Sequence, residues 1–304
     1  MNFSRIWMGL ILLLAATPAL VGAQTTPAAS PAAVTSPAPE SGDGDDKPFK
    51  PSWDNEVGFS HTSQQAGQNT NNLTYTGTYH FDEGGSFLSG EASVSTQKVG
   101  GVASKTGTLT ASGGVGIGIF TPSLSLGIQG GESALKQADG NLTLAFQLWE
   151  PFAVSLGVGA SVGSHQENLV NYFPVLQLLN QSIMGQFDTA SLNTSLELAY
   201  ILNDWWTLSL TTSTEYDATY KVQGVKNPNI SKDVNQTDRT ATLTLGMDFT
   251  LTKNWILEVS PQVGQEYAPA GTFYSALAGG TVTFATPTTT NFAAGTVSIS
   301  YNFQ

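Results

Sequence analysis

The sequence predicts an all-β fold: a closed antiparallel transmembrane β-barrel of about 12 strands, preceded by a signal peptide and a disordered linker. Three observations lead to this prediction. Segments of alternating polarity, each roughly ten residues long, recur from Trp53 to Phe303, as in strands with one apolar and one polar face. Tryptophan residues gather where these segments end, and lysine and arginine are absent from the segment centres.

The N-terminal part divides into two segments that lie outside the expected barrel. Residues 1–23 are expected to be a cleaved signal peptide, because a positive residue precedes an apolar run at 6–14 and small residues follow at 21–23. That run is short for a membrane-spanning helix of about 20 residues, which disfavours an anchor. Residues 24–52, rich in Pro, Ala and Ser with an acidic run, are expected to form a disordered linker, and 53–304 the barrel.

The alternation locates the strands. Its clearest instance runs from Phe152 to Gly163, where Phe, Val and Leu alternate with Ala, Ser and Gly. Pro261 falls inside an expected strand, so we expect a bulge or an earlier strand end there, because proline cannot donate a ladder bond. Residues 279–286 either lengthen the last strand or form a separate hairpin. The expected strands are 53–62, 72–81, 86–96, 106–119, 123–131, 140–149, 152–164, 189–201, 205–216, 239–251, 255–267 and 291–303.

The connections are expected to alternate between short turns and long loops, as in outer-membrane barrels with tight periplasmic turns. The expected short turns are 82–85, 121–122, 150–151, 203–204 and 252–254. The expected long loops are 63–71, 97–105, 131–139, 165–188, 217–238 and 268–290.

Aromatic residues near the short turns predict a girdle at the level of the lipid headgroups. The alternative is ordinary packing of these rings in the turns of a soluble protein. The expected girdle consists of Trp53, Trp149, Trp205, Trp206, Trp255 and Phe303, and a weaker outer girdle of Tyr216, Tyr220 and Tyr267. The placement of Lys and Arg agrees with this, because a lipid-facing cation at the bilayer midplane costs about 2–4 kcal/mol.

The stretch from Trp53 to Phe303 resembles the Gram-negative outer-membrane β-barrel superfamily, which includes the porins. The likeness is one of pattern, and no narrower family is identified. Tyr301 and Phe303 resemble the terminal aromatic signal of such barrels, although Gln304 follows. The resemblance implies a location in the cell outer membrane, contact with its lipid bilayer, and recognition by the outer-membrane assembly machinery.

Two features of the expected interior bear on function. Acidic residues occupy its polar face and predict a negative lumen; they are Glu56, Glu91, Glu197, Asp248 and Glu258, with Glu215 and Glu266 nearer the outer rim. The alternative is that these acids are merely hydrated or hydrogen-bonded inside a plugged barrel. The expected loop 165–188 is unusually apolar, and it predicts a constriction or lid, a helix at the membrane interface, or packing on other loops. The constriction or lid would use Tyr172, Phe173, Leu176, Leu179, Met184 and Phe187.

Composition and motifs disfavour other functions. The sequence has no Cys, which excludes disulfides and thiolate metal sites, and its three His residues lack recognisable catalytic partners. We therefore expect no enzyme activity, no cofactor and no metal. A net charge of −12 argues against nucleic acid as a partner.

The expected function is a porin-like channel for passive diffusion of small hydrophilic solutes, with a mild cation preference. The alternative is a non-conducting outer-membrane barrel with a structural or surface-binding role through its long outer loops. A soluble secreted all-β domain is a third interpretation. The solute and the oligomeric state stay open.

Overall fold

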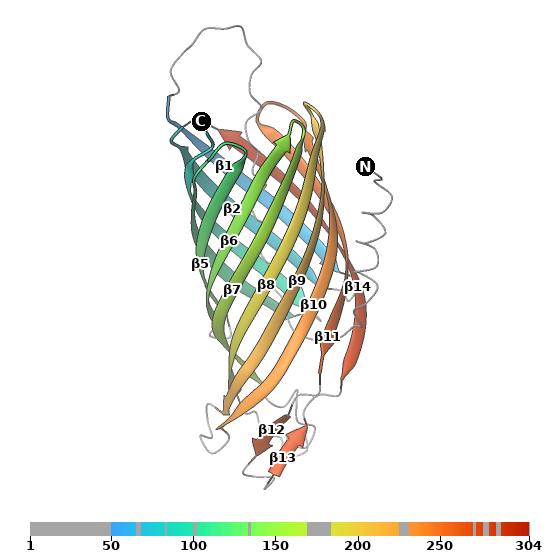
Figure 1. Ribbon diagram of the computed structural model, residues 1–304. Coiled ribbons are helices and arrows are strands. Elements are labelled where there is room, and N and C mark those ends of the chain that lie inside the picture. Colours follow the sequence, from blue (N-terminus) through green and yellow to red (C-terminus); the bar gives the residue numbers. More distant parts are fainter. Residues whose placement is uncertain are drawn as a thin grey trace, which may run out of the picture.

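Twelve antiparallel strands close into a barrel in the computed structural model of this protein (Figure 1). The structure describes residues 50–64, 68–82, 84–99, 102–132, 135–168, 184–224, 231–269, 272–275, 280–283 and 287–303. The prediction of a closed antiparallel barrel of about 12 strands is confirmed. The expected signal peptide and most of the expected linker lie outside the described residues.

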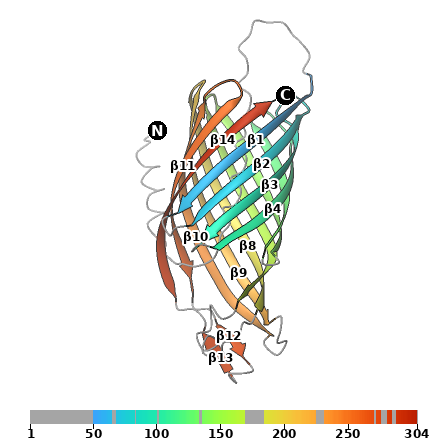
Figure 2. The same ribbon diagram turned by 180° about the vertical axis from the view of Figure 1, so that it is seen from behind.

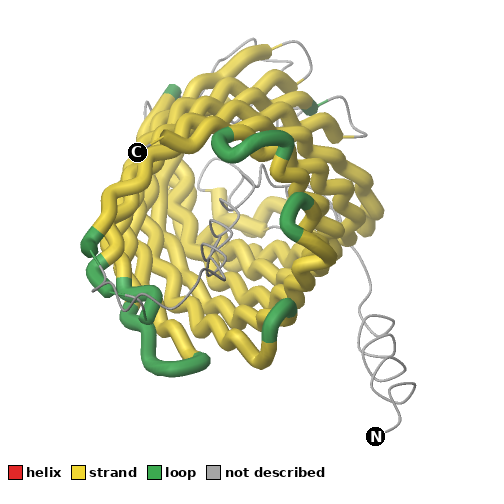
Figure 3. The backbone as a smooth tube through the Cα atoms, turned by 90° about the horizontal axis from the view of Figure 1, so that it is seen from above, coloured by secondary structure: helices red, strands yellow, loops and turns green. Residues whose placement is uncertain are grey.

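The barrel strands follow one another around the wall in chain order. They are β1 (Ser52–Gln64), β2 (Asn69–His80), β3 (Phe87–Val99), β4 (Val102–Gly114), β5 (Phe120–Gly131), β6 (Lys136–Trp149), β7 (Phe152–Asn168), β8 (Met184–Asn203), β9 (Trp206–Gly224), β10 (Ser231–Thr250), β11 (Trp255–Ala268) and β14 (Thr288–Phe303). Pairing of β1 with β14, from Asn55 opposite Phe303 to Gln64 opposite Ala294, closes the ring seen along its axis in Figure 3. β12 (Thr272–Ser275) and β13 (Gly280–Thr283) form the separate hairpin that was one of the two expectations for this segment.

The barrel is apolar on its outside. Large hydrophobic side chains alternate along the strands and are exposed, such as Leu73, Leu109 and Ile128. Among the described residues no large side chain is fully buried, and the buried hydrophobic residues are Phe187 and Ala268 alone. The apolar faces therefore surround the barrel instead of forming a core, which is the arrangement of transmembrane barrels.

The rim of the barrel is uneven. β7 to β10 contain 17, 20, 19 and 20 residues, whereas β1 to β6 contain 12 to 14. The longer strands project at the end opposite the C-terminus (Figures 1 and 2). We call the end with the C-terminus and the short turns the turn end, and the opposite end the loop end. Six extra residues lengthen a strand by about 20 Å, so one wall stands well above the other.

Several expected long loops are wrong, because the strands continue into them. β3 ends at Val99 and β4 begins at Val102, and these two residues are paired. β9 and β10 pair as far as Gln223 with Ser231, and a register shift lies between Asp233 and Gln236. Beyond the apolar band both faces of a strand meet water, so the alternation of polarity stops while the backbone ladder continues.

The expected strand 106–119 is wrong at its C-terminal end. β4 ends at Gly114, and Ile117 and Phe120 exchange backbone hydrogen bonds of 2.7 and 3.2 Å in a tight turn. Gly118 adopts φ = 63°, which favours glycine. The expected turn 121–122 consequently lies within β5.

The strand through Pro261 continues without a bulge, contrary to expectation. Pro261 is paired with Gly295 of β14. On the other side, the β10–β11 pairs run to Thr244 opposite Gln262 and resume at Met247 opposite Val259 in the same register. The β10–β11 pairing is interrupted only beside Pro261, which has no N–H to donate to β10. The two strands therefore keep the same register on both sides of the proline.

The described residues include no helix long and apolar enough to cross a membrane.

Candidate functional site

The candidate site is the inward face of the barrel wall, formed by the strand positions that alternate with the exposed hydrophobic residues. Hydroxyl side chains of neighbouring strands bond one another along it. Thr78 bonds Ser89 at 2.9 Å, and Ser161 bonds Ser191 at 2.8 Å. These bonds satisfy small polar groups and leave the wall hydrophilic.

The predicted acidic residues all occupy inward-facing positions. Glu56, Thr76 and Glu91 lie in one cross-strand row on β1, β2 and β3. Asp248 lies directly opposite Glu258 on β10 and β11. Glu197 of β8 is close enough to both to interact with them electrostatically.

Hydrogen bonds hold the Glu258 carboxylate. The Ser298 hydroxyl donates to it at 2.9 Å, and the Ser260 hydroxyl donates to its other oxygen. The two serine hydroxyls, from β11 and β14, are thus hydrogen-bond donors to the same carboxylate. Glu258 is thereby held on the inner wall, opposite Asp248 and within electrostatic reach of Glu197.

A second acidic group lies nearer the loop end, where Asp217 and Asp238 join the predicted Glu215 and Glu266. Asp217 lies opposite Asp238, and Thr240 separates Glu215 from Glu266. The expected loop at 217–238 is therefore wrong here, because both aspartates belong to paired strands. The sequence does contain a sign of their position. Asp217 is an even number of residues from Glu215 on β9, and Asp238 is an even number from Asp248 on β10, so each faces the same side as its neighbour.

One cross-strand row links acids on both walls. From Glu91 the pairing continues through Thr110 and Gly127 to Asp139. It then passes Ser161 and Ser191 to Asp217 and Asp238. Carboxylates thus recur along a single band of the inner wall instead of meeting at one point.

Positive side chains lie elsewhere. Among the side chains that the structure describes, no lysine or arginine takes an inward-facing strand position. His80 is on the inward side at the turn end, where its Nε2 lies 3.1 Å from Asp54 Oδ2. Arg239 faces outward, with its guanidinium 5.8 Å from the Tyr216 ring centre and 5.6 Å from that of Tyr267.

The residues of the expected aromatic girdle lie at the turn end on outward-facing positions. Trp53, Trp149, Trp205, Trp255 and Phe303 are exposed, and Trp206 is half-buried. Neighbouring rings contact one another, for example Trp149 with Phe152 and Trp255 with Tyr301, both at 4.9 Å between ring centres. In the weaker outer girdle, Tyr216 and Tyr267 flank Arg239.

The expected constriction loop is shorter than predicted. β7 and β8 pair as far as Asn168 with Met184, so Met184 and Phe187 belong to β8 and not to a loop. Phe187 is 7% exposed and stacks on the His165 ring at 5.3 Å. The other proposed constriction residues, Tyr172, Phe173, Leu176 and Leu179, lie outside the described residues.

The described part of the chain contains no group of three or more His, Asp or Glu side chains able to hold a metal ion. The carboxylates are spread along the wall, so what they offer is a field over the lumen face instead of a ligand set.

No protein-family model matches this sequence, and no curated protein matches it. Among solved structures, the chain is similar to the KdgM porin at 14% identity and a TM-score of 0.44, covering 82% of this chain and 99% of that one. It is similar to the NanC porin at 9% identity and a TM-score of 0.45, covering 81% and 98%. It is also similar to an outer membrane channel from Pseudomonas putida F1 at 11% identity and a TM-score of 0.47, covering 83% and 95%. The closed barrel with its apolar exterior agrees with the outer-membrane β-barrel superfamily that the sequence resembles.

Proposed function

We propose that this protein is an outer-membrane channel for passive diffusion of small hydrophilic solutes, with a preference for cations. The observation that carries the proposal is the charge of the inner wall. Inward-facing carboxylates recur on both walls, and no described lysine or arginine side chain shares these positions. A low-dielectric wall that carries one sign of charge concentrates the opposite ion near it.

The apolar exterior supports the membrane location. Leucine, valine and isoleucine side chains stay exposed on the outward face, which water would disfavour and hydrocarbon would solvate. Delivery to the outer membrane would use the signal peptide expected at 1–23 and the assembly machinery that recognises terminal aromatic residues.

Conductance in planar bilayers tests the channel directly. The triple variant E197Q/D248N/E258Q removes the central acidic group, and its cation-to-anion permeability ratio in a KCl gradient should fall. A matched control, E132Q/E150Q/D204N, removes three exposed charges outside the inner wall and should leave the ratio unchanged. No conductance by the wild type would exclude the channel, and an unchanged ratio in the first variant would exclude the proposed basis of selectivity.

The second candidate is a non-conducting barrel that binds a surface partner at its loop end. The uneven rim favours it, because β8 to β10 present paired backbone well beyond the neighbouring strands. A folded, membrane-inserted protein with no conductance would support this function over the first.

A further inference from the structure

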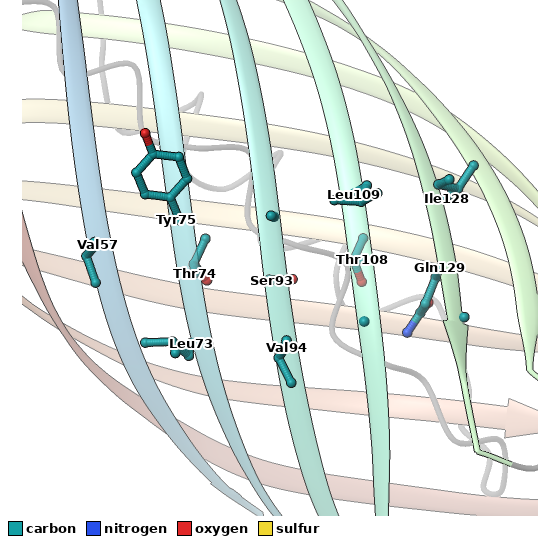
Figure 4. Close-up of a pocket in the computed structure, with 13 residues that line it drawn as sticks. Val57, Leu73, Thr74, Tyr75, Ser93, Val94, Thr108, Leu109, Ile128 and Gln129 are labelled. Carbon is teal, nitrogen blue, oxygen red and sulfur yellow. The ribbon is translucent and has the colours of Figure 1, made fainter.

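The outer wall carries a hollow that the proposed channel does not use. It lies on the outward face of β1 to β5 and has a volume of about 690 Å³ (Figure 4). Ala92, Gly107 and Gly130 form its floor, and larger side chains such as Leu109 and Ile128 stand around it. A Cβ atom built on Gly107 or Gly130 would meet no heavy atom closer than 3.8 Å, so the space above both glycines is open.

A second hollow of about 490 Å³ continues the first across β5, β6 and β7. The two share Ile128 and Gln129, and Val162 extends the apolar lining of the second. We call them together the outer groove. The groove lies in the part of the wall that hydrocarbon would surround, so its natural filling is an apolar chain.

Two lysines stand at the loop-end side of the outer groove. Lys105 is the outward-facing residue that precedes Gly107 on β4, on the side of the loop end. Lys136 is paired with Gly130 and lines the second hollow. Among the described residues no ion pair engages either lysine. The neighbouring Glu132 carboxylate accepts a hydrogen bond from the Lys105 backbone N–H at 3.2 Å.

An apolar groove ending at two free ammonium groups matches a lipid with an acyl chain and a phosphate. Basic residues at the edge of a membrane-embedded groove bind anionic headgroups. The lysines lie towards the loop end, which faces outward if the turns are periplasmic. We propose that the outer groove binds a phosphate-bearing glycolipid of the outer leaflet, with an acyl chain over Gly107 and Gly130 and a phosphate at Lys105 and Lys136.

This inference rests on the proposed outer-membrane location but not on conductance. Native mass spectrometry of the folded full barrel in detergent tests it, with diphosphoryl lipid A as the probe and its dephosphorylated form as the comparison. The wild type should retain the phosphorylated probe at least about tenfold more tightly, since each lysine near a headgroup contributes to anion binding. Equal retention of the two probes would overturn the proposal.

Two variants separate the parts of the site. K105Q/K136Q should lose the discrimination between the probes, and G107L/G130L should weaken retention of both by filling the groove. The matched controls are K253Q, which removes a turn-end cation, and A293L, which adds an outward-facing side chain on β14; both should bind as the wild type does. Wild-type binding by both groove variants would overturn the proposal.

Two further measurements keep the outcomes distinct. A heat-dependent gel shift verifies that each variant is folded. Conductance of the same samples separates the two proposals, because a folded barrel that conducts but retains no phosphorylated probe refutes the lipid site alone. An oligomer that G107L dissociates would overturn the proposal as well, since the groove would then be a contact between copies.

Discussion

Asp248 and Glu258 lie directly opposite each other on β10 and β11, both facing the inside of the barrel. Like charges at directly paired positions destabilise a sheet. We therefore expect D248N to raise the free energy of unfolding by about 0.2–1 kcal/mol while it lowers cation preference. Urea titration of the barrel in vesicles measures the first effect and reversal potential the second. D204N, in an exposed turn, is the control, and a less stable D248N would contradict the expectation.

A close approach between two turns predicts a strong effect at Gly116. A Cβ atom there would lie 1.4 Å from the Gly84 carbonyl oxygen, and the Gly116 N–H donates to the Ser86 hydroxyl at 3.1 Å. G116A should force the turns apart and lower the free energy of unfolding by about 1–3 kcal/mol. G90A is the matched control, because a Cβ at Gly90 meets nothing within 4 Å. Equal stability of the two variants in urea titration would refute the packing of these turns.

The turn that follows β2 predicts a pH dependence. The Ser86 backbone N–H donates to Asp82 Oδ1 at 2.9 Å, and together with the Ser86 hydroxyl and the Gly84 and Gly85 backbone it lowers the pKa of Asp82 from its ordinary value of 3.8. A lowered folded-state pKa gives stabilisation that is fully present above 3.8 and is lost as the pH falls through the folded-state value.

The variant D82N removes this titration. Wild type should exceed D82N in stability at neutral pH, and the difference should shrink as the pH falls below 3.8. Urea titrations between pH 7 and the acid range measure it, with D204N as a turn variant whose difference from wild type should not follow the same course. A constant difference between wild type and D82N would contradict the prediction.

Arg239 predicts a contribution from cation–π contacts on the outer face. Its guanidinium lies near the rings of Tyr216 and Tyr267. Each such contact at an exposed site contributes about 0.5–1 kcal/mol. Y216L and Y267L should each destabilise the barrel by that amount in urea titration, whereas Y216F and Y267F keep the ring face and should not. If R239A abolishes the cost of Y216L, the two residues are coupled as described.

The sequence predicted the strands where they carry alternating hydrophobic residues. It did not predict how far the strands continue beyond that apolar band. Val154, Leu156 and Val158 mark one strand by hydrophobic alternation alone, whereas Asp217 and Asp238 belong to paired segments beyond the apolar band, where hydrophobic alternation stops. The turn after β4 was misplaced for a related reason. Gly116 and Gly118 alternate with hydrophobic residues there, so the sequence looks like a continuing strand.

The arrangement of the interior and of the outer groove depends on register, which a single sequence does not reveal. Parity placed Glu91 and Asp248 on the inner wall, but only the pairing shows that Glu91 and Asp139 share a row. In the same way Gly107 and Gly130 are unremarkable in the sequence, and they form one floor because they are paired across β4 and β5.

The unequal strand lengths give the barrel a slanted mouth. A solute that approaches from the lower side passes over β1 to β6 and faces the tall wall, where Glu215, Asp217, Asp238 and Glu266 lie. In the proposed channel a cation would therefore be attracted sideways before it is aligned with the axis of the barrel, and an anion would be repelled at the mouth instead of deeper inside. If β8, β9 and β10 were shortened together, the rim would be even. The first carboxylates that a solute meets would then be those of Glu197, Asp248 and Glu258.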